Sequence, residues 1–296
     1  MHDHSNCEHH QPANYSTAFA IGVALNATFV IVEIMYGIMA RSLSLLADAG
    51  HNVGDVLGLL MGWGAAYLTT RPPTERRTYG YRRSSILAAL ANSSLLLVAV
   101  GAIAWEAVQR LSKPVGVPGS VVMSVAAFGI LINGGTALMF VRGRKNDLNI
   151  EGAYMHMLTD AIVAFGVVLA GLAIKLTGAA WIDTASSLVI VALIAIGSWS
   201  LLRRSFDLAI DAVPSGIDPS QVRSYLVSQV GVTAVSDLHI WGMSTTEIAL
   251  TAHLVMPRGC DEDFVAEIAH ELSDRFGIAH STIQVDRSTK SCVLTV

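Results

Sequence analysis

The sequence predicts an α-helical membrane protein with six transmembrane helices, followed by a cytoplasmic α+β domain of ferredoxin-like kind. Two observations predict the membrane part. Only 14% of the 296 residues are charged, against roughly 25% in an average soluble domain, and the mean hydropathy is +0.52. A third observation separates the two parts, because residues 1–206 sum to a net charge of +3 and residues 207–296 to −7. This charge balance and composition exclude a basic nucleic-acid-binding protein.

Six stretches are apolar enough to cross a bilayer, which needs about 20 largely apolar residues per helix. They are residues 16–38, 45–69, 85–110, 118–141, 152–175 and 182–202. The breaks between them carry proline and basic residues, as in Arg71-Pro72-Pro73. Ten basic residues flank the spans on the side of the loop between spans 2 and 3, and four on the other side. This asymmetry predicts that both termini lie in the cytoplasm.

The chain beyond the last span has the pattern of a small folded domain. Alternating, β-branched stretches at 236–242, 247–256 and 281–285 predict strands, and the spacing of apolar residues at 219–230 and 261–276 predicts helices. The order α-β-β-α-β suits a ferredoxin-like sandwich. The sequence therefore divides into a flexible His-rich arm (1–15), a six-helix transmembrane domain (16–206) and a cytoplasmic metal-binding and dimerisation domain (207–296).

Two of the predicted spans each carry a histidine and an aspartate four residues apart. These are His51 with Asp55 in the second span and His156 with Asp160 in the fifth. A spacing of four places both side chains on one face of a helix, and ionisable groups inside a membrane mark functional sites. Two imidazoles and two carboxylates make a tetrahedral site suited to Zn²⁺. The alternative is that each histidine bonds its own aspartate and joins the helices.

Further polar residues lie within or at the ends of the predicted spans. Asp48 precedes His51 by three residues and is a candidate partner of the metal ligands or part of a pathway to the exterior. Glu33 and Asn133 are candidates for lining a proton or ion path, with an interhelical hydrogen bond as the alternative role. Asp183, at the start of the last span, is expected at the membrane interface.

The tail offers a second set of possible metal ligands. His239 and His253 lie on the first two predicted strands, His280 begins the last strand, and Asp286 follows it. Neighbouring strands can bring such residues together into a metal site; the alternative is that they are ordinary surface or core residues. The arm is either metal-capturing or simply His-rich, and its metal-capable residues are His2, His4, Cys7, His9 and His10.

Several segments resemble the cation diffusion facilitator family, and within it the bacterial zinc, cobalt and cadmium resistance transporters and their animal zinc-transporter relatives. Two of the matching segments contain the histidine–aspartate pairs, and the matches extend over nearly the whole chain after residue 15. The segments are SLLADAGHNVGD at 44–55, TYGYRR at 78–83, GAYMHMLTD at 152–160, DLHIW at 237–241 and HSTIQ at 280–284.

The resemblance implies a homodimer, in a bacterial inner membrane, whose cytoplasmic tail binds metal and helps dimerise. It also implies that His51, Asp55, His156 and Asp160 form the transport site, and that the tail site draws on His239, His253, His280 and Asp286. A charge interlock between subunits of the family suggests Arg83 with Asp207 or Asp211 here. Some members carry metal ligands in the loop between spans 2 and 3; here that loop offers only Glu75, so no loop site is expected.

The expected function is a secondary antiporter that exports cytoplasmic Zn²⁺ against protons and so confers metal homeostasis or resistance. His51 and His156 are the expected proton exchangers, because metal binding requires neutral imidazoles. Zinc is then substrate and regulatory ligand, with no prosthetic group. The alternatives are a membrane metal sensor and an exporter of broader range, including Co²⁺, Cd²⁺ and Ni²⁺. An intramembrane metalloprotease is not expected, because the chain has no H-E-x-x-H run.

Overall fold

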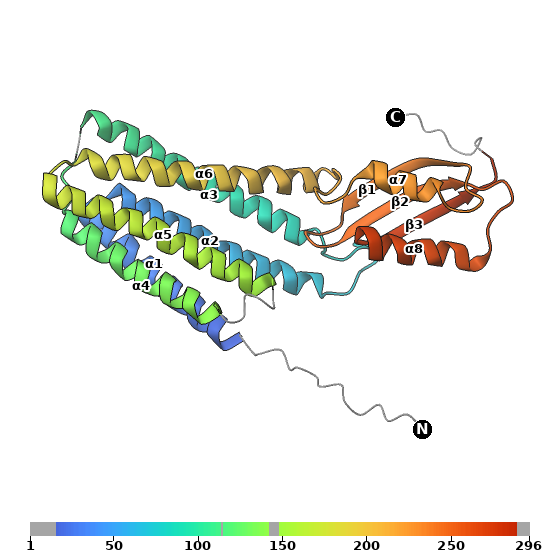
Figure 1. Ribbon diagram of the computed structural model, residues 1–296, viewed down its shortest axis with the longest axis horizontal. Coiled ribbons are helices and arrows are strands. Elements are labelled where there is room, and N and C mark those ends of the chain that lie inside the picture. The colour runs from blue at the N-terminus through green and yellow to red at the C-terminus, as the bar shows by residue number, and fades with distance from the viewer. Residues whose placement is uncertain (1–15, 114, 142–147, 289–296) are drawn as a thin grey trace, which may run out of the picture. The chain divides into compact units, whose positions relative to one another are not determined.

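The computed structural model describes residues 16–113, 115–141 and 148–288 (Figure 1). The His-rich arm therefore lies outside the described residues. The chain forms two compact units. The first comprises residues 1–56 and 96–196, and the second comprises residues 57–95 and 197–296.

Six long helices precede the sheet. They are α1 (Ser16–Ala40), α2 (Leu43–Thr69), α3 (Ser84–Ser112), α4 (Gly119–Phe140), α5 (Leu148–Thr177) and α6 (Trp181–Ala209). Of the described helices, α3, α4, α5 and α6 are long and apolar enough to cross a membrane, and α1 contributes a shorter apolar stretch, Ala24–Ala40. Many of their apolar side chains are exposed, such as Leu131 and Leu193, as expected where the surrounding solvent is lipid.

Close packing of α4 against α5 fixes the helix that carries His156 and Asp160. A Cβ atom at Gly119 would lie 2.7 Å from the amide nitrogen of Lys175, and one at Gly171 would lie 2.8 Å from the amide nitrogen of Met123. Because these neighbours are backbone atoms, only glycine fits, and small residues let membrane helices approach closely. The two helices therefore lie side by side in the first unit (Figure 1).

The second unit contains a three-stranded sheet and two short helices. Its elements follow the order α7 (Pro219–Val227), β1 (Ala234–Gly242), β2 (Ile248–Val255), α8 (Glu262–Phe276) and β3 (Ile278–Asp286). This is the order expected from the sequence. The strands lie in the order β1-β2-β3, with β1 antiparallel and β3 parallel to β2. One core joins both helices to the sheet: Leu226 of α7, Leu250 and Leu254 of β2, and Leu272 of α8 are fully buried.

Local signals in the sequence set the ends of the short helices. The Asp218 side chain accepts a hydrogen bond from the Ser220 amide at the start of α7, and Pro219 fills the first helical position. Asp261 caps α8 in the same way, accepting from the Phe264 amide at 3.0 Å. Gly277 ends α8 with φ of +67°, a left-handed conformation that favours glycine.

One feature differs from the sequence-based expectations, because helix α6 continues to Ala209, beyond the expected span end at residue 202. Asp183, expected at the membrane interface, is 1% exposed, and its carboxylate accepts a hydrogen bond at the start of α2. Its partners lie about 140 residues earlier in the chain, so local sequence carries no sign of this burial.

Candidate metal centre

The two histidine–aspartate pairs meet inside the first unit. His51 Nε2 lies 3.6 Å from Asp55 Oδ2 and 3.5 Å from Asp160 Oδ1. His156 Nε2 lies 3.4 Å from Asp55 Oδ2 and 3.6 Å from Asp160 Oδ2. The four side chains therefore alternate nitrogen and oxygen around a ring, and each histidine contacts the aspartate of the other helix as well as its own.

Three residues of the ring lie close enough together to hold a metal ion. The ligand atoms of His51, Asp55 and Asp160 all lie within 4.8 Å of one another. His156 is not part of this group, but its Nε2 contacts both carboxylates. Zn–N and Zn–O bonds of about 2.0–2.2 Å place neighbouring ligands of a tetrahedron roughly 3.3–3.6 Å apart, and the four nitrogen–oxygen separations lie in this range.

Buried atoms without hydrogen-bond partners also indicate that the ring holds a cation or protons. Both carboxylate oxygens of Asp160 and Oδ2 of Asp55 are buried without a hydrogen-bond donor. Leaving such atoms unpaired is costly, so a cation or bound protons must compensate the charge. Two carboxylates balance the charge of one divalent cation, and the neutral imidazoles complete its shell.

Exposure differs around the ring. The side chains of Asp55, His156 and His51 are 27%, 40% and 24% exposed, whereas that of Asp160 is 2% exposed. On the same face of α2, Ser44 and Asp48 are buried toward the start of the helix. The ring is therefore closed on the side of the turn between α1 and α2.

A buried polar layer surrounds the ring. Glu33, Asp48 and Asn52 are all nearly inaccessible. The Asn52 amide donates a hydrogen bond to Glu33 Oε2 at 3.1 Å, while Glu33 Oε1 has no donor. Asn133 of α4 is also buried, with an unpaired Oδ1. Asn52 was not among the expected residues, although it follows His51 directly and lies four residues after Asp48.

The tail residues gather only in part. His253 Nδ1 lies 3.3 Å from Asp286 Oδ2, and His253 Nε2 lies 3.5 Å from Oδ2 of Asp237. His239 Nε2 in turn lies 2.9 Å from Oδ1 of Asp237. We call His239, His253, Asp286 and Asp237 the tail cluster. Asp237 was missed by sequence reasoning, although its place two residues before His239 on a strand was a usable signal.

Backbone geometry explains how Asp237 enters the tail cluster. The pairing of β1 with β2 is irregular between Ser236 and His239, and Asp237 has φ of +50°. A left-handed conformation is unfavourable for a residue other than glycine, and such strain marks functional positions. The bulge brings the Asp237 carboxylate against both histidines.

His280 does not join the tail cluster, contrary to expectation. It pairs in the sheet with Ala249, whereas Gln284 pairs with His253. Four residues along a strand correspond to roughly 13 Å. Instead, the His280 ring packs edge-on against Tyr79, with ring centroids 5.9 Å apart. An alternating pattern alone does not reveal which end of a neighbouring strand a residue faces.

The second unit also contains a charge pair within the chain. Arg83 forms an ion pair with Asp211, whereas Asp207 forms no ion pair with it among the described residues. The interlock between subunits stays a prediction. Next to Arg83, Arg82 Nη1 lies 3.0 Å from Glu247 Oε2, and the Thr245 amide donates to Ser85 Oγ at 3.1 Å. The start of α3 is thus tied to the loop between β1 and β2, an attachment that was not anticipated.

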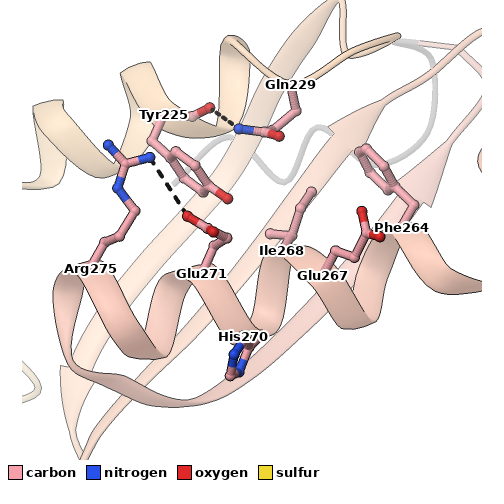
Figure 2. Close-up of a pocket in the computed structure, with 8 residues that line it drawn as sticks. All are labelled: Tyr225, Gln229, Phe264, Glu267, Ile268, His270, Glu271 and Arg275. Atoms are coloured by element: carbon pink, nitrogen blue, oxygen red, sulfur yellow. Dashed lines mark hydrogen bonds and ion pairs between the residues drawn. The ribbon is translucent and has the colours of Figure 1, made fainter.

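A separate hollow of about 440 Å³ lies between α7 and α8 (Figure 2). Arg275 pairs with Glu271 at 3.8 Å, and the Gln229 amide donates to the Tyr225 carbonyl at 3.1 Å. Burial is the main reason that the pKa of the Tyr225 hydroxyl is raised. No member of the tail cluster lines this hollow.

Apolar helices around a ring of histidine and aspartate define the class: a membrane protein that handles metal cations. Comparison with known proteins gives the family. A family model described as "Cation efflux transmembrane domain" matches residues 19–208, and one described as "Cation efflux protein, cytoplasmic domain" matches residues 214–288. The chain therefore belongs to the cation efflux, or cation diffusion facilitator, family. Members of this family are transporters, and the chain is not an enzyme.

Curated relatives carry names of the same kind. The chain is 32% identical to the "Metal cation efflux system protein CzcD" of Cupriavidus metallidurans, over 94% of this chain and 89% of that protein. It is 32% identical to the "Zinc transporter ZitB" of Escherichia coli, over 96% and 92%. It is 30% identical to the "Cadmium, cobalt and zinc/H(+)-K(+) antiporter" of Bacillus subtilis, over 94% and 91%.

Proposed function

We propose that this protein exports Zn²⁺ from the cytoplasm in exchange for protons. The observation that carries the proposal is the ring of His51, Asp55, His156 and Asp160, with nitrogen–oxygen separations of 3.4–3.6 Å and unpaired carboxylate oxygens. Its two carboxylates match a divalent cation in charge, and its donor set suits zinc. The names of the zinc-transporter relatives support the choice of metal.

Proton exchange follows from the chemistry of the ligands. Zinc binds neutral imidazole and ionised carboxylate, so loading the ring displaces protons, and proton binding displaces the metal. We assign the exchange to His51 and His156, because an ordinary histidine titrates near physiological pH. Alternating access of the ring to the two sides of the membrane turns this competition into coupled transport. Glu33, Asp48 and Asn133 are proposed to line the proton or ion path.

The remaining assignments belong to the same proposal. The chain crosses a bacterial inner membrane six times with both termini in the cytoplasm, which makes the exposed end of the ring the cytoplasmic one. The boundaries are an arm at 1–15, a transmembrane domain at 16–206 and a ferredoxin-like tail at 207–296. The tail assembles the homodimer, with Arg83 and Asp211 near the interface, and the tail cluster binds zinc as a regulatory ligand.

A broader metal range is the second candidate, because two relatives are named for cadmium and cobalt as well as zinc. A two-nitrogen, two-oxygen site accepts these ions too, and raw affinity does not decide selectivity. Competition between Zn²⁺, Cd²⁺, Co²⁺ and Ni²⁺ for transport distinguishes the two candidates.

The test is zinc accumulation in sealed vesicles that contain the purified protein and carry a pH gradient. We expect zinc to accumulate against its own gradient, and dissipation of the pH gradient to stop it. A membrane metal sensor would instead bind a fixed number of ions and accumulate none, and that result would overturn the proposal. His270→Ala is a suitable control, because His270 is exposed and its one ion pair among the described residues is with Asp274 on its own helix.

A further inference from the structure

A short turn joins α1 to α2 at the closed end of the ring. Helix α1 ends at Ala40, and α2 begins at Leu43. Arg41 has φ of +52°, and the Ser42 amide donates to the Gly37 carbonyl at 3.0 Å. The first amide groups of α2 have no partners within their own helix.

Asp183 of α6 supplies those partners. Its carboxylate accepts hydrogen bonds from Ser42 Oγ and Ser44 Oγ, both at 2.6 Å, and from the Leu43 amide at 2.7 Å. The Ser44 amide points to the same carboxylate at 3.4 Å. Both serines are fully buried, and Asp183 is 1% exposed. A negative charge at the start of a helix also interacts favourably with the helix dipole.

The serines lie on the face of α2 that carries the metal ligands. Ser44, Asp48, His51 and Asp55 follow one another at spacings of four, three and four residues, which places them along one stripe of the helix. Along the stripe, Ser44 and Asp48 are buried near Asp183, whereas His51 and Asp55 are partly exposed. The carboxylate therefore holds the helix at the end of the stripe where the ring is closed.

We propose that Asp183 is a positioning residue which, with Ser42 and Ser44, forms a latch that keeps the ring closed toward the α1–α2 turn. The proposal rests on the proposed alternating access, because the ring must open toward that turn to release its ion. An interaction that exists in one conformation and is lost in the other shifts the population toward the first. The latch stabilises the conformation in which the ring faces the end where α5 begins.

A second attachment holds α1 rather than α2. Arg110 of α3 donates to the Arg41 carbonyl, and its Nε lies 3.0 Å from Glu106 Oε1. Helix α1 therefore stays fixed to α3 while the latch between α2 and α6 opens. A substitution of Arg110 therefore serves as a comparison variant, because it affects the same turn without removing the latch.

The experiment reads accessibility from one side of the membrane. Cys7, Cys260 and Cys292 are the native cysteines; each is replaced by serine, and Ala47→Cys is introduced as a reporter. Ala47 is fully buried one turn beyond Ser44. The full chain is reconstituted in vesicles, and a membrane-impermeant thiol reagent is added from either side in separate samples.

In the reporter background, Asp183→Asn preserves shape and removes the charge. We expect it to raise labelling from the side of the α1–α2 turn roughly tenfold, the size expected when charge-assisted hydrogen bonds are lost, and to leave labelling from the other side unchanged. The double change Ser42→Ala with Ser44→Ala is expected to act in the same direction, and it replaces Asp183→Asn if that variant does not fold. Ser186→Ala is the matched control, because its hydroxyl bonds only the Asp183 main-chain carbonyl.

Arg110→Gln is expected to lower the thermal midpoint without a one-sided rise in labelling. Unchanged labelling in Asp183→Asn, or an equal rise from both sides, would overturn the latch, because loosened packing exposes the reporter to both. The reagent requires no metal, so a latch result stands even if the ring proves not to bind zinc.

Discussion

The membrane ring and the tail cluster use the same two kinds of side chain in opposite surroundings. In the ring, Asp160 is 2% exposed and has no hydrogen-bond donor. In the tail cluster, Asp237 is 46% exposed and has a close histidine partner. Water can compensate the second charge but not the first. A buried ring must hold either an ion or protons, which suits exchange, whereas an exposed cluster can stand empty, which suits sensing.

The largest difference is expected when one ligand is removed from each region. Asp160→Ala should lower zinc transport in vesicles at least about a hundredfold. The substitution removes one oxygen ligand and one of the two negative charges that balance the charge of the ion. Asp237→Ala should leave maximal transport within about twofold of the wild type, because water and the remaining ligands can compensate an exposed site. Equal losses in the two variants would remove the distinction between the regions.

The packing of α4 against α5, which holds the helix that carries His156 and Asp160, can be tested by substitution. Gly171→Leu forces a side chain against the Met123 amide nitrogen, 2.8 Å from the Cβ position. We expect a loss of stability of about 2 kcal/mol from overpacking, measured as a lower thermal midpoint in detergent. Gly101→Leu is the control, because no atom lies within 4 Å of a Cβ at Gly101. Equal midpoints for both variants would show that this contact does not hold α5.

A smaller effect is expected for zinc binding at the tail cluster. Asp237→Ala should weaken zinc binding at the tail roughly tenfold, in line with the loss of a residue that orients ligands, while His280→Ala should leave it unchanged. The measurement is the zinc-dependent rise in the thermal midpoint of the tail, recorded in a background with Asp160→Ala. A larger effect of His280→Ala than of Asp237→Ala would restore the ligand set expected from sequence.

The smallest effect concerns the start of α7. Hydrogen bonds from the Ser220 hydroxyl and amide lower the pKa of the Asp218 carboxyl. A lowered pKa contributes stability above the ordinary aspartate range, near pH 4, and the contribution is lost as pH falls through the lowered pKa. The thermal midpoints of wild type and Asp218→Ala should therefore differ at neutral pH and converge in acid. A difference that persists below pH 2 would contradict this account of the cap.

The ring could be predicted from the spacing of residues on one helix, whereas the contacts between distant segments could not be predicted. A four-residue interval on a helix determines that His51 and Asp55 share a face, and the same holds for His156 and Asp160. The latch depends on Asp183 meeting residues about 140 positions earlier, and the tail cluster depends on a bulge at Asp237 and on strand register. The register between distant segments has no signature within one segment, so His280 was chosen. Asp237 was missed although it lies two residues before His239 on the same strand.

Zinc-driven proton movement tests the central claim most directly. Vesicles containing the full chain and a trapped pH indicator receive external zinc, and both zinc uptake and internal pH are recorded. We expect zinc entry to be accompanied by proton exit, and both to be absent in Asp160→Ala. Zinc entry without proton movement, or the same coupled movement in Asp160→Ala, would contradict the assignment of exchange to the membrane ring.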